Sequence, residues 1–189
     1  MKTKKAFVHL NMNNRGFSLL ELIVVIAVMA ILVGVVVASS SMMDSSYVKE
    51  VERGIEDYVN MAKSKSMSVS AREWYVELTV YKGEYVTRLC RTEETEAGEE
   101  TKLRTVTVDE ESYNNRATVT FDDGVSARAI SASAPLCIYF DNATGRVSRI
   151  TVGGVEADMS SGIGTIAIGS GSYDIVLRLF YNTGKCERE

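Results

Sequence analysis

The sequence is poor in three residue types on which structural and catalytic sites often depend. Its 189 residues include one proline, one histidine and three cysteines. The histidine, His9, lies near the N-terminus, so a chain that loses this stretch has no imidazole for a catalytic triad or for metal binding. Cys90, Cys137 and Cys186 lie far apart and form no CxxC pair, so the usual zinc-ligand spacing is absent. At most one disulfide could form, with its pairing open, and we predict neither a cofactor nor a metal site.

Acidic residues are missing from residues 1–16, which hold four basic residues: Lys2, Lys4, Lys5 and Arg15. The whole chain has a formal net charge of −4, so the part after residue 16 is more acidic than the total indicates. A broad nucleic-acid interface needs a clustered basic face, which this distribution disfavours without excluding a smaller one.

Charge is also scarce in residues 17–38, where the only ionisable side chain is Glu21. As a helix, this run would be on the order of 30 Å long, enough to cross the hydrocarbon core of a bilayer. Because basic residues precede it and none follows directly, the N-terminus is predicted to be cytoplasmic and the rest extracytoplasmic. The sequence therefore predicts a single-pass protein of the cytoplasmic membrane.

Three interpretations of this run compete. A secretory signal peptide could be cleaved before Ser39, but the apolar run is longer than a usual signal core. A plain anchor would leave Glu21 without a role, although a charge in the membrane is costly and usually functional. Cleavage between Gly16 and Phe17 would instead place a new α-amino group one helical turn from Glu21, about 6 Å along the axis. That amine, or the amine of a neighbouring chain, could compensate the carboxylate.

The stretch from Arg15 to Val28, RGFSLLELIVVIAV, resembles the N-terminal signal of type IV pilins and of the pseudopilins of type II secretion and competence systems. The basic leader, Gly16, Phe17, Glu21 and the apolar run all fall in register with that signal. The resemblance implies removal of the leader after Gly16 by a prepilin peptidase, N-methylation of Phe17 by the same enzyme, and a role for Glu21 in assembly.

The same resemblance implies the partners and the location of the chain. The partners would be other pilin or pseudopilin subunits, the prepilin peptidase/methyltransferase, an assembly platform in the membrane, and membrane lipid before assembly. The chain would begin in the cytoplasmic membrane and end in a periplasmic or extracellular filament. Many major pilins have a proline where this chain has Ala38, so helix melting at that point is not implied here.

After a short polar segment, apolar residues recur at three- and four-residue spacing, as expected for an amphipathic helix to about Lys65, which Gly54 could bend. These residues are Val48, Val51, Ile55, Tyr58, Val59 and Ala62. From Glu73 onward the period is two, and short turns separate the runs, which indicates antiparallel strands. The expected strands are 74–81, 85–91, 103–108, 117–121, 136–140, 147–152, 164–168 and 173–181. The acidic segment Thr92–Lys102 is expected to be an exposed, poorly ordered loop.

These patterns predict an α+β fold in which a long N-terminal helix, hydrophobic and then amphipathic, packs on an all-antiparallel β head of two sheets. The predicted parts are a leader (1–16), a membrane or filament-core helix (17–38), its amphipathic continuation (39–68) and the head (69–189). Within the head, residues 138–146 and 181–186 resemble the strand and turn pattern of H-type minor pseudopilins. Arg146, Arg149, Lys185 and Arg188 lie near these turns but form no dense basic patch in the sequence.

The sequence favours a minor pilin or pseudopilin, a structural subunit of a type IV pilus, type II secretion or competence filament. The alternative is a membrane-anchored extracellular β domain that binds a surface or DNA, as an adhesin or DNA-uptake receptor does. An enzyme is disfavoured because no compact nucleophile motif is present and His9 lies in the leader.

Overall fold

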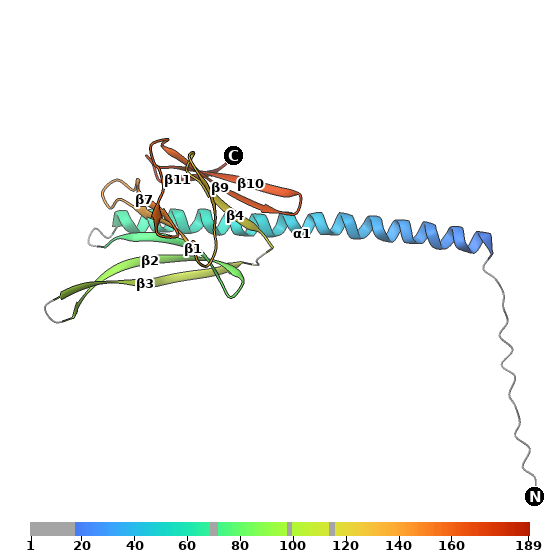
Figure 1. The fold of residues 1–189 in the computed structure, drawn as a ribbon, viewed down its shortest axis with the longest axis horizontal. Helices are drawn as coiled ribbons and strands as arrows, with labels where there is room; N and C mark the ends of the chain where they lie inside the picture. The colour runs from blue at the N-terminus through green and yellow to red at the C-terminus, as the bar shows by residue number, and fades with distance from the viewer. Residues whose placement is uncertain (1–17, 69–71, 98–99, 114–115) are drawn as a thin grey trace, which may run out of the picture. The chain divides into compact units, whose positions relative to one another are not determined.

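The computed structural model describes residues 18–68, 72–97, 100–113 and 116–189. The chain divides into two compact units, Met1–Ser39 and Ser40–Glu189. The elements, in chain order, are α1 (Leu19–Ser68), β1 (Trp74–Tyr81), β2 (Glu84–Ala97), β3 (Glu100–Tyr113), β4 (Thr118–Asp122), β5 (Ala127–Ala129), β6 (Leu136–Phe140), β7 (Val147–Val152), β8 (Val155–Glu156), β9 (Ile163–Ser170), β10 (Tyr173–Phe180) and β11 (Lys185–Arg188) (Figure 1).

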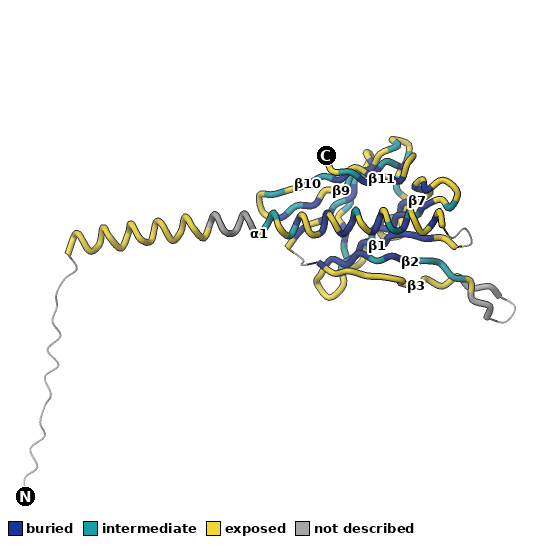
Figure 2. Tube along the Cα trace, turned by 180° about the vertical axis from the view of Figure 1, so that it is seen from behind, coloured by how far each residue is buried: buried dark blue, intermediate teal, exposed yellow. Residues whose placement is uncertain are grey.

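The part of α1 from Leu19 to Val36 is apolar except for Glu21. All of its residues are exposed with respect to the part of the chain that the structure describes (Figure 2). This surface cannot remain in water, because an exposed apolar face of this extent requires lipid or another apolar surface to cover it.

The second half of α1 buries one side of the helix in the head. The predicted stripe from Val48 to Ala62 is buried, which confirms the helical spacing read from the sequence. It packs in one cluster with residues of both sheets, including Trp74 and Leu78 of one sheet and Ile166 and Leu177 of the other. Burial of large apolar side chains, at roughly 1.5–3 kcal/mol each, therefore holds this half of the helix to the head.

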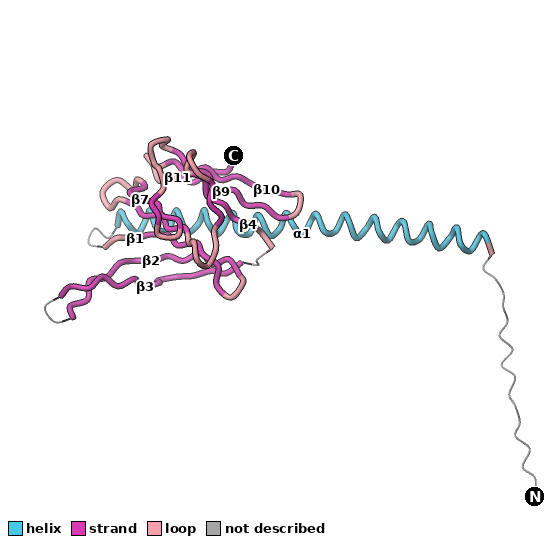
Figure 3. The backbone as a smooth tube through the Cα atoms, in the orientation of Figure 1, coloured by secondary structure: helices cyan, strands magenta, loops and turns pink. Residues whose placement is uncertain are grey.

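The head contains two antiparallel sheets, with strand order β3-β2-β1-β6-β7-β8 in the first and β11-β10-β9-β4-β5 in the second (Figure 3). Inward-facing residues alternate with outward-facing ones, as in β9, whose residues Gly164, Ile166, Ile168 and Ser170 are buried. This arrangement confirms the predicted α+β fold with a β-rich head of two sheets. Strands 74–81, 136–140 and 147–152 have the predicted bounds.

The prediction for Thr92–Lys102 was wrong. Residues 92–97 belong to β2 and residues 100–102 to β3, and the two strands pair from Tyr85↔Tyr113 to Ala97↔Glu100. The acidic composition led to the expectation of a loop, but threonine, which occurs three times in this segment, favours strands, and pairing between β2 and β3 satisfies the backbone. Three short strands, β5, β8 and β11, were also missed, because runs of two to four residues carry no readable period.

Gly54 does not interrupt α1, which is helical throughout from Leu19 to Ser68. A Cβ atom at Gly54 would lie 1.9 Å from the Tyr113 hydroxyl oxygen and 2.2 Å from the ring carbon Cζ. Tyr113, at the end of β3, is only 2% exposed. Gly54 therefore allows an aromatic ring to pack directly on the helix backbone.

Candidate functional site

Ser18 determines where α1 begins. Its hydroxyl oxygen accepts a hydrogen bond from the Glu21 backbone N–H at 3.1 Å, and its carbonyl oxygen accepts one from the Leu22 N–H at 3.1 Å. Ser18 is thus the N-cap and Glu21 the third helical residue, the positions of a capping box. The sequence interpretation missed this role, although a serine three residues before a glutamate at the start of an apolar run is its signature.

Glu21 lies in the first turn of α1 and is exposed. A carboxylate at this position is favoured by the positive end of the helix dipole. Its side chain forms no ion pair with a residue that the structure describes. Gly16 and Phe17, the predicted cleavage and methylation positions, lie outside the described residues.

The apolar surface that follows Glu21 meets the requirements of a membrane-spanning helix. Residues Leu19–Val36 have a mean hydropathy of 3.1, and none of them is buried in the structure. This helix fits a single-pass membrane anchor, and it carries one carboxylate near its N-terminal end.

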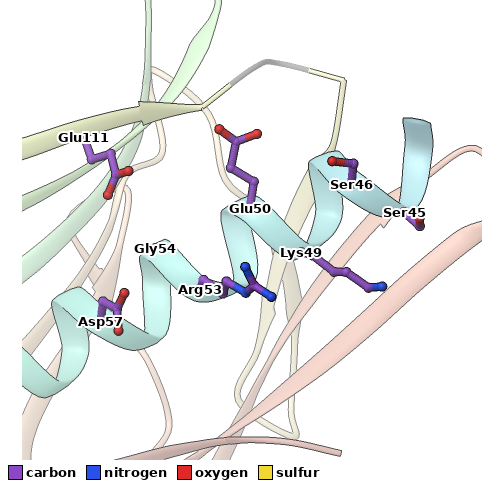
Figure 4. A pocket seen from close by; sticks show the side chains of 8 residues that line it. All are labelled: Ser45, Ser46, Lys49, Glu50, Arg53, Gly54, Asp57 and Glu111. Atoms are coloured by element: carbon purple, nitrogen blue, oxygen red, sulfur yellow. The ribbon is translucent and has the colours of Figure 1, made fainter. Parts of the chain in front are cut away.

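In the head, a polar hollow follows the open side of α1. Its volume is about 600 Å³, and Figure 4 shows the side chains that line it: Ser45, Ser46, Lys49, Glu50, Arg53, Asp57 and, from β3, Glu111, with Gly54 on the helix backbone. The lining mixes acids and bases and contains no cysteine or histidine. It therefore offers no paired nucleophile and imidazole base.

The basic residues near the two turns of the head form contacts within the chain. Arg146 donates to Asn182 Oδ1 at 2.8 Å, and Arg188 lies 3.8 Å from the Glu52 carboxylate. Arg149 stacks on Tyr139, with its guanidinium carbon 4.0 Å from the ring centroid, and Lys185 pairs with Glu187. Each of the four cations therefore has a partner within the head.

The three cysteines are buried free thiols. Cys90 is on β2 and pairs with Tyr75 of β1, whereas Cys137 is on β6 and pairs with Glu77 of β1. Strand β1 therefore lies between the two cysteines. Two strand spacings separate their backbones by about 10 Å, more than the roughly 7 Å that a disulfide allows. Cys186 belongs to the other sheet. The disulfide that the sequence left open is therefore not formed in this structure.

Asp123, in the turn after β4, is a buried carboxylate that is 2% exposed. Its Oδ1 accepts the N–H groups of Val125 and Ser126, and its Oδ2 accepts those of Arg128 and Asp158. These donors, with the backbone N–H groups of Ser126 and Val125 first, hold the pKa of the Asp123 carboxyl well below its usual range. Through these hydrogen bonds, Asp123 connects the turn after β4 to the loop before β9.

Metal binding finds no support in residues 18–68, 72–97, 100–113 and 116–189, because no group of three or more His, Cys, Asp or Glu side chains there could hold an ion.

Comparison with known protein families identifies the N-terminal segment. Residues 11–37 match the family model of the prokaryotic N-terminal methylation motif, the type IV pilin and pseudopilin signal. The match includes Gly16, Phe17 and Glu21, and it supports a type IV pilin-like or pseudopilin precursor that is processed by prepilin peptidase and assembles with other pilin subunits.

No curated protein and no solved structure matches the chain. The likeness of the head to H-type minor pseudopilins therefore stays a prediction from the sequence.

Proposed function

We propose that this chain is a minor pilin or pseudopilin, a structural subunit of a type IV pilus-like filament, and not an enzyme. One observation carries the proposal: a helix with a fully exposed apolar surface begins just after the methylation-motif glycine and holds a single carboxylate, Glu21, in its first turn. A catalytic role would require a set of reactive side chains in the head, whereas the unusual group in this chain, the Glu21 carboxylate, lies at the start of the apolar helix.

The proposed sequence of events begins with insertion of the chain, its N-terminus in the cytoplasm. The prepilin peptidase cleaves between Gly16 and Phe17 and methylates the new amine of Phe17. The apolar half of α1 holds the subunit in the membrane until the assembly platform extracts it. In the filament, the apolar helices of many subunits cover one another and the heads face outward.

Glu21 is proposed to pair with the Phe17 amine of an adjacent subunit. An unpaired charge inside the membrane costs roughly 2.5–3.5 kcal/mol on insertion scales, so its neutralisation favours the assembled state. Because the two charged groups lie within one helical turn of each other in sequence, their pairing between chains also fixes the axial offset of neighbouring helices.

Replacement of Glu21 by alanine tests this role. Leader removal should continue, because the peptide bond after Gly16 is unchanged, while the amount of the subunit in sheared filaments should fall at least tenfold. Glu50→Ala is the matched control, since Glu50 is an exposed acid on the same helix and lies in the head. Normal incorporation of Glu21→Ala, or equal loss in both variants, would refute the pairing.

The mature N-terminus tests the class of protein itself. Mass spectrometry of the purified chain should give an N-methylated Phe17. A mature chain that begins at Ser39, or one that keeps its leader, would contradict the proposed function whatever the effect of Glu21.

A further inference from the structure

One end of the head carries tyrosine rings that each lie against a cation. In three pairs the cation lies 5.2 to 5.9 Å from the ring centroid: Lys82 over Tyr81, Arg116 over Tyr47 and Lys49 over Tyr173. Tyr81 is 53% exposed, and Met43, one helical turn before Tyr47, is 46% exposed. Apolar rings, a thioether and cations are therefore accessible together.

These groups lie at the end of the head where α1 enters it, which we call the entry end. Asp44 of α1 accepts a hydrogen bond at 3.3 Å from the Ser170 hydroxyl, at the β9–β10 turn. Strand β3 ends at Tyr113, which pairs with Tyr85 beside the β1–β2 turn. Figures 1 and 3 show both turns at the entry end.

Only a few residues separate the entry end from the apolar span. A carboxylate is least costly at a membrane interface, so Glu21 is expected at one boundary of the hydrocarbon core. The core takes about 20 helical residues, which places its other boundary near residue 41. Tyr47 follows six residues later, about 9 Å along an α-helix. This distance is close to the outer edge of the headgroup layer, which is about 5–8 Å thick on each side.

The charges of the entry end are nearly balanced. Its cations are Lys49, Arg53, Lys82 and Arg116, and its acids are Asp44, Glu50, Asp57, Glu84 and Asp174. Farther along the first sheet, Arg88 pairs with Glu77 and Glu110, and Glu111 accepts a hydrogen bond from the Tyr113 hydroxyl. An excess of positive charge therefore does not attract this end to an anionic surface.

We propose that the entry end of the head lies on the phospholipid surface while α1 spans the membrane. The rings of Tyr47, Tyr81 and Tyr173 would lie in the headgroup layer, and their cations would bind lipid phosphates. Tyrosine is enriched at membrane interfaces because its ring is apolar and its hydroxyl polar, and lysine and arginine extend their charged ends to the headgroups. The inference rests on the membrane anchor of the proposed function. Because these contacts are lost when the subunit leaves the membrane, they favour the membrane-bound state over the filament.

Fluorescence quenching in vesicles tests the contact. The full chain is reconstituted in phosphatidylcholine vesicles that carry a nitroxide on the lipid headgroup, and a fluorescent label is attached to one introduced cysteine. The three native thiols are buried, so the label reacts at the introduced site. Ser172→Cys reports the β9–β10 turn, and Ser112→Cys reports the end of β3 beside the β1–β2 turn. Ala143→Cys reports the opposite end of the head, where Gly145 lies against Met67 of α1.

The labels at Ser172 and Ser112 should each lose about half of their fluorescence, and the label at Ala143 should lose little. Quenching at Ser172 alone would show that the short connection to the span keeps the head near the lipid without docking, and would overturn the proposal. Equal quenching at all three sites, or none at the entry end, would overturn it as well.

Removal of one pair provides the second test. Tyr81→Ser combined with Lys82→Asn should lower the quenching at Ser112 about twofold or more, since one ring and one cation no longer bind the headgroups. Asparagine is chosen because Lys82 has a φ of 52°, which asparagine tolerates. Lys65→Ser combined with Met67→Ser is the matched control, because it removes a cation and a side chain that is 47% exposed from the opposite end of the head. This control should leave the quenching unchanged.

Circular dichroism checks that each variant is folded, and flotation with the vesicles checks the anchor. Unchanged quenching in the folded Tyr81 and Lys82 variant refutes the contact. A chain that floats without entry-end quenching overturns the docking and leaves the anchor intact, whereas a chain that does not float contradicts both proposals.

Discussion

Replacement of Gly54 by alanine should destabilise the head by about 2–4 kcal/mol, although the same change stabilises most helices. Alanine is favoured over glycine in a helix interior by roughly 1 kcal/mol. Here the added Cβ would lie 1.9 Å from the Tyr113 hydroxyl oxygen, 2.2 Å from Cζ and 2.8 Å from Cε1. These distances are far below an ordinary carbon contact of about 3.5–4.0 Å.

The overlap cannot be relieved by a small rotation of the ring. Tyr113 is 2% exposed, and its hydroxyl donates to Glu111 Oε2 at 3.0 Å. Its displacement would lose much of the burial of an aromatic side chain, for which full truncation costs about 3–5 kcal/mol, and would strain the helix contact. This loss exceeds the gain in helix propensity, which sets both the sign and the size of the prediction.

Urea unfolding of the full chain in detergent, followed by fluorescence of Trp74, measures the effect. Trp74 is the single tryptophan and is buried in the head. Gly34→Ala is the matched control, since it is the same change in the same helix and its Cβ meets no atom within 4 Å. Gly34→Ala should leave the unfolding of the head unchanged.

A double-mutant cycle isolates the contact. In a Tyr113→Ala background, Gly54→Ala should become neutral or stabilising by up to about 1 kcal/mol, because the ring is gone. If Gly54→Ala is neutral or stabilising with Tyr113 present, the ring does not pack on the helix backbone as described.

Three further predictions concern other parts of the chain. Because the folded-state pKa of Asp123 is depressed, its contribution to stability is present above the unfolded pKa of about 3.9 and is lost as pH falls below it. Asp123→Asn should cost about 1.5–3 kcal/mol at pH 7 and flatten the fall in stability in acid titrations followed by circular dichroism. Burial raises the pKa of the Cys137 thiol to about 11, so the native chain at pH 8 should react with a thiol reagent only after urea unfolding, whereas fast native labelling would contradict the packing. Ser18→Ala should remove the helix cap at a cost of about 1 kcal/mol and speed amide exchange at Glu21, while Ser18→Thr should not.

The N-terminal signal could be predicted from the sequence because its information is local and ordered. A basic leader, a glycine, a phenylalanine and a glutamate one turn later lie within a few residues of one another, before an uncharged run. The buried stripe of α1 was predictable for a similar reason, since the spacing from Val48 to Ala62 is the period of the helix itself.

The extent of the β2–β3 ribbon was not predictable in this way. Composition marked Thr92–Lys102 as a loop, but backbone pairing between the consecutive strands β2 and β3 makes it regular. The hydrogen bonds of Asp123 depend on segments that are distant in the sequence, because its four donors come from the turn after β4, from β5 and from the loop before β9.

The sequence by itself determined the character of the N-terminal part of the chain. This part is an apolar helix that must be covered by lipid or by other helices, and Glu21 lies near its start. The tertiary structure decided which residues of the head depend on one another. Gly54 is needed because Tyr113 crosses it, the thiols stay free because β1 separates Cys90 from Cys137, and β3 is open because no strand lies beyond it in the described sheet. The physical reason is the distance in sequence over which each kind of information acts. Hydrophobic periodicity and N-terminal signals involve neighbours in sequence, whereas close packing and strand order are set by residues that meet only after folding.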